Sequence, residues 1–181
     1  MEWISVNDIN ITQGSIVDGV KWDFFDDDPA SIILSNACDL AHNHSSYLIV
    51  AALFPANHVI MNSREIQGII GQEAVDLTKK QKEAVGKTIS DYIHHKTINR
   101  YYFIDCTHSD LGMPMVVDFQ LIKSIPIEQK DDLHPIANLV SPLKEQMMIQ
   151  YACYTARIPS DRVSGETEER LIKEIAAGKL D

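Results

Sequence analysis

The sequence predicts one α+β domain over residues 1–159, with a helical appendage over residues 160–181. Short apolar runs rich in Val, Ile and Leu indicate strands in two groups, and each group is followed by segments with helically spaced apolar residues. The resulting order of strands, helices, strands and helices favours an α+β class over regular strand–helix alternation. With 181 residues, 45% of them hydrophobic, the chain is long enough to bury a core.

The first group of predicted strands covers residues 14–17, 32–34 and 47–54. The last two are continuously apolar, as expected for short strands that are buried on both faces. Residues 36–46 between them are rich in Asn, Asp, His and Ser, which favour turns. Pro55 then ends the third strand.

An inserted helical block follows over residues 55–96. Isoleucines at positions 60, 66, 69 and 70 are roughly helically spaced. In residues 81–95 one stripe of apolar side chains indicates a clearer amphipathic helix, formed by Val85, Ile89, Tyr92 and Ile93.

The second group of predicted strands covers residues 100–106 and 115–125, separated by a loop with Gly112 and Pro114. Residues 128–134 are polar and expected to be exposed. Ser141 suits the N-cap of a helix, and Pro142 suits its first turn. Its apolar face has Leu143, Met147, Tyr151, Tyr154 and Ile158, and Pro159 stops it.

A last helix is predicted from Ser164 to Gly178. Acidic residues at positions 166, 168 and 169 suit its positively polarised first turn. Leu171, Ile172 and Ile175 give it a small apolar face.

The formal net charge of −10 disfavours extended nucleic-acid binding, which depends on clustered Lys and Arg. Asp23 and residues 26–28 form an acidic run, expected to be a solvated loop or a docking surface for a basic protein partner. There is no signal-peptide pattern, and no apolar stretch is long enough to span a bilayer. With three widely spaced cysteines, these features predict a cytoplasmic protein with free thiols or a metal.

Residues 36–46 also hold the candidate site residues. Cys38, His42 and His44 have the spacing Cys-x3-His-x-His, and Cys106 and His108 follow a later predicted strand. If both strand ends lie at one edge of the sheet, these five side chains converge as candidate ligands. Thiolate and imidazole ligands suit tetrahedral zinc.

Two alternatives use the same residues. Cys38 is a candidate nucleophile, with His42, His44 or His108 as its base and Asp39 orienting that base. Alternatively the segment is a structural turn, in which Asp39 accepts backbone amides and Cys38 is buried beneath the loop. Of the three, the turn is favoured.

Residues 14–54 resemble the MazF/PemK toxin endoribonucleases, which have small SH3-like barrels. The matching pieces are GSIV at 14–17, IILS at 32–35 and YLIVAALFP at 47–55. Ser15 replaces the Asp of that family's opening motif, and Pro29-Ala30 stands where Arg-Pro would be, so the family's catalytic arginine is missing. The SNACD stretch at 35–39 and residues 138–159 are similar to uncharacterised bacterial proteins with a Ser-x-x-Cys-Asp motif.

The resemblance implies an SH3-like small β-barrel, or a curved antiparallel sheet, with the helical block inserted and C-terminal helices added. The function it implies is a binding or regulatory module of a bacterial toxin–antitoxin or phage-defence system, with a protein partner. The alternative is a hydrolase. That hydrolase would be either a toxin-like ribonuclease or a metal- or thiol-dependent enzyme using Cys38, Asp39 and the histidines.

Overall fold

The structure, a computed structural model, describes residues 2–7, 9–42, 44–70, 77–96 and 100–156. The appendage over 160–181 and its predicted helix lie outside this part of the chain, as do Ile158 and Pro159. The strands are β1 (Ile4–Ser5), β2 (Ser15–Asp18), β3 (Ser31–Ile33), β4 (Tyr47–Pro55), β5 (Tyr101–Ile104), β6 (Met115–Pro126) and β7 (His134–Leu139). The helices are α1 (Ala37–Ala41), α2 (Ala56–Met61), α3 (Arg64–Ile70), α4 (Lys79–Ile93), the 3-10 helix η1 (Ile127–Asp132) and α5 (Leu143–Thr155).

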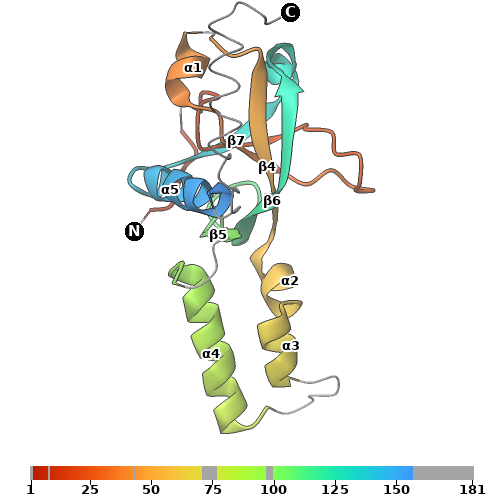
Figure 1. The fold of residues 1–181 in the computed structure, drawn as a ribbon, viewed down its shortest axis with the longest axis vertical. Helices are drawn as coiled ribbons and strands as arrows, with labels where there is room; N and C mark the ends of the chain where they lie inside the picture. The colour runs from red at the N-terminus through yellow and green to blue at the C-terminus, as the bar shows by residue number, and fades with distance from the viewer. Residues whose placement is uncertain (1, 8, 43, 71–76, 97–99, 157–181) are drawn as a thin grey trace, which may run out of the picture.

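The seven strands form one antiparallel sheet in the order β1-β7-β2-β3-β4-β6-β5. The sheet curls into a half-barrel, with α5 packed beside it and α2, α3 and α4 projecting from one end (Figure 1). This confirms the predicted α+β class and the curved antiparallel sheet. None of the described helices is long and apolar enough to cross a bilayer.

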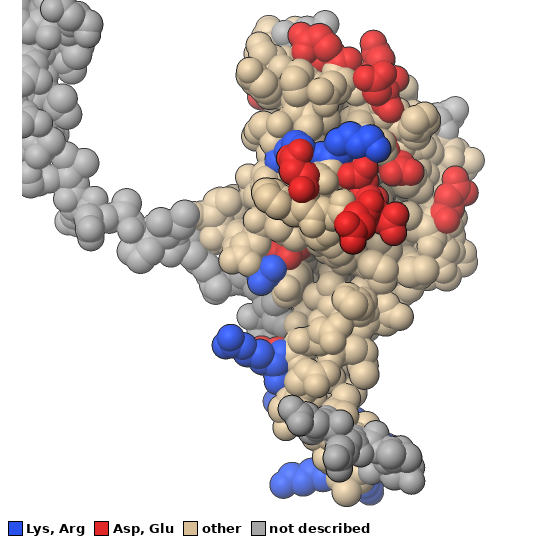
Figure 2. Space-filling model, turned by 90° about the vertical axis from the view of Figure 1, so that its right-hand side faces the viewer, with Lys and Arg blue, Asp and Glu red and all other residues tan. Residues whose placement is uncertain are grey.

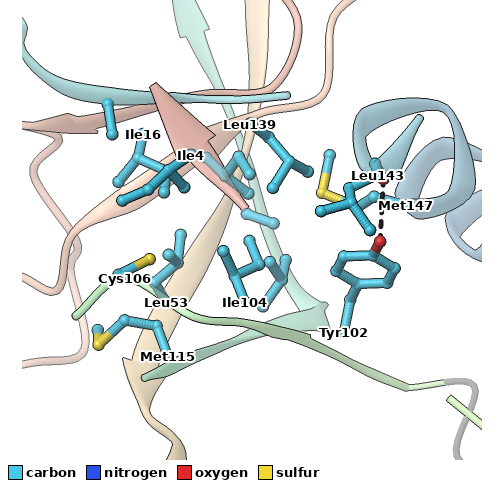
Figure 3. Close-up of a cluster of buried hydrophobic side chains, with 14 of the residues drawn as sticks. Ile4, Ile16, Leu53, Tyr102, Ile104, Cys106, Met115, Leu139, Leu143 and Met147 are labelled. Atoms are coloured by element: carbon cyan, nitrogen blue, oxygen red, sulfur yellow. Dashed lines mark hydrogen bonds between the residues drawn. The ribbon is translucent and has the colours of Figure 1, made fainter. Parts of the chain in front are cut away.

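The main core fills the concave side of the half-barrel and is closed by α5 (Figure 3). Both edge strands contribute to it, with Ile4 from β1 and Ile104 from β5. Leu143 and Met147 of α5 are buried against these strands, and the Tyr102 hydroxyl donates to the Leu143 carbonyl oxygen at 2.9 Å. The apolar face predicted for residues 143–154 is therefore what attaches α5 to the sheet.

The longest ladder pairs β4 with β6 and contains a bulge. Ala51 is paired with Ile122 while Ala52 is paired with Asp118, so the residues between these two positions of β6 loop out. Asp118 is 3% exposed and accepts from Arg100 Nε at 2.8 Å and Nη2 at 2.7 Å. This bidentate ion pair neutralises a buried carboxylate beside the bulge.

The projecting helices form what we call the arm, residues 56–70 and 77–96. Pro55 is both the last residue of β4 and the N-cap of α2, so the arm continues the sheet directly. Thr78 and Gln81 form a capping box at the start of α4. Ile66 of α3 and Tyr92 of α4 are buried in a second cluster, which also includes Phe103 of β5 and Val116 of β6 and so joins the arm to the sheet.

Three local expectations were wrong. Residues 36–46 contain the short helix α1 and not only a turn. Residues 4–5 and 134–139 are strands that the sequence pattern did not predict. The N-cap of α5 is Pro142 rather than Ser141.

Candidate functional site

The polar segment after β3 is exposed. Asn36 caps α1 by accepting from the Cys38 amide at 2.8 Å, as short polar side chains do at helix starts. The Cys38 side chain is exposed rather than buried beneath the loop, and Asp39 is exposed as well, so the predicted form of the structural turn is wrong. His42 and His44 follow α1 with their rings 5.5 Å apart.

Cys106 and His108 lie at the other end of the sheet. The strands β3, β4, β6 and β5 are neighbours in this order, and each neighbouring pair is antiparallel. β3 and β5 therefore run in opposite directions, and their C-terminal ends lie at opposite ends of the strands of the sheet. The chain leaves β3 toward the Tyr47 end of β4 and leaves β5 toward its Pro55 end. Because a strand rises about 3.3 Å per residue, these two ends of β4 are roughly 26 Å apart.

The condition for a five-ligand zinc site is therefore not met. Cys106 belongs to the main core, and burial raises the pKa of its thiol to about 12. Among the described residues, no three His, Cys, Asp or Glu side chains are grouped so as to hold a metal ion. His108 is too far from Cys38 to be its base; a nucleophilic Cys38 served by His42 or His44 stays a prediction.

An open apolar groove lies at the base of the arm and is the candidate site. It encloses about 380 Å³, and the side chains that line it are almost all apolar. Its walls come from α2, α4, β5 and the residues before β6. They are Ala56, Asn57, Ile60, Met61, Ile89, Ile93, Phe103, Met113 and Pro114. We call this feature the arm groove.

The fold holds the walls of the arm groove in place. The Ala56 amide donates to the Pro114 carbonyl oxygen at 2.9 Å, which joins the first turn of α2 to the residues before β6. Phe103 of β5 also lines the groove and belongs to the same buried cluster as Ile60 of α2. Met61 and Met113 are 46% and 43% exposed, so their thioethers line an open surface. Flexible Met side chains suit a surface that adapts to a bound apolar segment.

The arm and the half-barrel differ in charge. Residues 56–96 carry six of the chain's 16 Lys and Arg but only five of its 26 Asp and Glu. Figure 2 shows basic side chains along the arm and acidic side chains gathered over the half-barrel. Lys82 precedes Ile89 by seven residues, two turns of α4, so it lies on the helix face that lines the arm groove.

An aromatic stack fastens the arm to the half-barrel. His95, just after α4, has φ 54° and stacks on Tyr102 of β5 with ring centroids 4.1 Å apart. Trp3 contacts His95 and Phe103 edge-on. Burial lowers the pKa of His95 from 6.5 to about 4, so the imidazole is neutral at pH 7. Packed aromatic rings thus hold the C-terminal end of the arm, just after α4, against the half-barrel.

Comparison with models of known protein families gave no match, and comparison with curated protein sequences gave none either. The arm groove was missed by the sequence analysis. The stripe with Ile89 and Ile93 was recognised, but nothing in it signals that these two side chains border an open groove.

Proposed function

We propose that the protein is a binding module whose arm groove receives an apolar segment of a protein partner. The observation that carries this proposal is an open apolar groove of about 380 Å³ with two exposed methionines, on an arm that projects from the half-barrel. An amphipathic helix that places Leu, Ile or Met at i, i+3 and i+4 fits a groove between two helices.

The basic side chains of the arm indicate which charges the partner carries. Lys82 lies on the same face of α4 as Ile89 but about 10 Å further along the helix, outside the groove lining. Together with the other basic residues of the arm, it favours acidic residues on the partner next to the part that enters the groove. Such pairs steer association and select among partners more than they add affinity. We therefore expect a partner helix that is apolar on one side and acidic next to it.

The proposal extends to the cellular setting and the fold family. The resemblance of residues 14–54 to MazF/PemK proteins supports an SH3-like half-barrel and a regulatory role in a bacterial toxin–antitoxin or phage-defence system. A cytoplasmic location is supported by Cys38, Cys106 and Cys153, which are all unpaired.

The test begins with the full-length protein expressed with an affinity tag in its native cells. Proteins retained with it are identified, purified and titrated against it by calorimetry. The double variant Met61→Asp/Met113→Asp should weaken binding at least about tenfold, since each buried Met is worth about 1.5–3 kcal/mol. Ile149→Asp on α5 is the matched control, because Ile149 is 65% exposed outside the groove.

Two outcomes would overturn the proposal. One is a partner whose affinity is the same for the double variant and for the control. The other is growth arrest on expression together with RNA cleavage by the purified protein, which would make it a toxin-type ribonuclease. Melting curves of both variants establish that the fold is kept.

A further inference from the structure

A loop of the half-barrel displays an aromatic ring to solvent. The loop between β2 and β3, residues 21–29, carries Phe24, whose side chain is 86% exposed, and four of the chain's aspartates. We propose that this loop, which we call the Phe24 loop, docks in the arm groove of a second copy of the protein. The inference rests on the proposed function, because it assigns a ligand to the same groove.

Contacts on either side of Phe24 hold the Phe24 loop in one conformation. Trp22 is buried, and its Nε1 donates to Ser31 Oγ at 3.0 Å. The Asp28 carboxylate accepts from the Trp22 amide at 2.6 Å. Phe25 packs against Trp22, with ring centroids 6.3 Å apart. Since the loop is already ordered, presenting its exposed ring to a groove costs little conformational entropy.

Two aspartates of the Phe24 loop are left to interact with another molecule. Lys21 and Lys123 each form an ion pair with a different aspartate of the loop, at 2.9 and 2.8 Å. Asp26 and Asp27 are exposed, and neither pairs with a Lys or Arg in the part of the chain that the structure describes. An apolar ring flanked by free carboxylates favours a binding surface that is apolar and lies near basic side chains.

The arm groove suits an aromatic ring. Met61 and Met113 line it with exposed thioethers, and contacts between a thioether sulfur and an aromatic ring are favourable. Phe103 also lines the groove and offers a ring against which a second ring can pack edge-on. The groove of about 380 Å³ has room for one Phe side chain. Because Phe24 is exposed, its ring does not fill the groove of its own chain.

The distribution of charge favours a second copy in this orientation. Among the described residues, the arm carries six Lys and Arg against three Asp and Glu, whereas the rest of the chain carries five against 14. Figure 2 shows the acidic side chains gathered over the half-barrel. The net charge of −10 opposes most contacts between copies. Placing the acidic Phe24 loop of one copy on the basic arm of another instead brings opposite charges together.

The test measures self-association of the full-length protein by analytical ultracentrifugation over a range of concentrations. Phe24→Asp removes the ring, and Met61→Asp/Met113→Asp alters the groove. Each change should weaken self-association at least about tenfold, because each removes one side of the same contact. Ile149→Asp is the matched control, since it adds the same charge at an exposed apolar residue of α5 and should leave self-association unchanged. Melting curves establish that every variant keeps the fold.

Mixing the two variants tests the pairing of loop with groove. Phe24→Asp keeps an intact groove and the double variant keeps an intact loop, so the mixture should associate more tightly than either variant alone. Three results would overturn the proposal. They are a parent that stays monomeric up to about 1 mM, self-association of Phe24→Asp equal to that of the parent, and a mixture that associates no better than its components.

The proposed function is tested separately from this inference. Phe24→Asp leaves the arm groove intact, so titration of this variant with the partner reports on the groove without competition from a second copy. Tight partner binding by a protein that never self-associates would overturn the docking of the Phe24 loop and leave the proposed function standing. If both proposals hold, Phe24→Asp binds the partner more tightly than the parent does at concentrations where the parent self-associates.

Discussion

The indole of Trp3 and the ring of Phe103 meet edge to face, with centroids 5.6 Å apart and planes at 79°. Trp3 adjoins β1 and Phe103 lies in β5, and these are the two edge strands of the sheet. Two side chains therefore span the opening of the half-barrel at the place where the arm begins.

We expect Trp3→Ala to destabilise the fold by about 2 kcal/mol, below the cost of truncating a fully buried aromatic residue because Trp3 is only half-buried. Urea unfolding measures the change. Phe24→Ala is the control, since Phe24 is 86% exposed. Equal unfolding midpoints for the two variants would mean that the Trp3–Phe103 contact does not hold the edges together.

The ion pair at the β6 bulge gives a second prediction. Arg100→Met leaves the buried Asp118 carboxylate without its guanidinium, and we expect a loss of about 1–3 kcal/mol because Arg100 is itself partly exposed. Lys21→Met removes the exposed Lys21–Asp28 pair, which is 2.9 Å long, and should change stability little. Chemical unfolding at pH 7 compares the stabilities of the two variants. A similar loss in both would mean that the buried Arg100–Asp118 pair contributes no more than an exposed ion pair.

His95 predicts a dependence of stability on pH. Its pKa is about 4 in the folded protein, lowered from 6.5 by burial, so between these values the unfolded chain binds a proton that the folded chain does not. Its contribution is fully present above pH 6.5 and is lost as the pH falls toward 4. The loss is about 2 kcal/mol after allowing for the partial exposure of the ring.

Unfolding at pH 7 and pH 4.5 tests this for the parent and for His95→Phe, which keeps an aromatic ring but cannot be protonated. The variant should lose less stability over that interval than the parent does. His58→Phe, a change at an exposed histidine of α2, should keep the parent's pH dependence. Identical pH dependence in the parent and His95→Phe would show that His95 is not responsible.

The three cysteines should differ in reactivity toward iodoacetamide. Cys38 and Cys153 are exposed, whereas Cys106 is buried with its thiol pKa raised to about 12, so little thiolate forms there. Mass spectrometry at pH 8 should find two alkylated cysteines in the native protein and three in urea. Rapid alkylation of Cys106 without denaturant would contradict its place in the core.

Much of the fold follows from local pattern. Apolar runs predicted β3 and β4, and helically spaced apolar residues predicted α4 and α5. These patterns are strong signals because the buried faces of these elements require apolar side chains. The strand β7 escaped prediction because Pro135 and Asn138 interrupt its pattern. Pro135 is tolerated there because it pairs with Val17, next to a register shift in the ladder with β2.

The candidate sites depend on information that local pattern does not contain. Cys38 and its histidines would lie near Cys106 and His108 only if β3 and β5 ran in the same direction. The order and pairing of the strands decide their directions, and local sequence does not reveal either. Likewise, the stripe on α4 predicts burial for Tyr92, Ile89 and Ile93 alike. The tertiary packing of α4 decides that Tyr92 is buried, whereas Ile89 and Ile93 border a groove.

The junction at Pro55 has a mechanical consequence. Since β4 passes into α2 without a linker, and Ala56 is tied to Pro114 by its amide, a force applied to the arm acts directly on the long β4–β6 ladder. The orientation of the arm relative to the sheet is therefore fixed at its base. If the arm groove binds a partner as proposed, that partner meets a surface whose orientation is already fixed, so little rotational freedom of the arm is lost on binding.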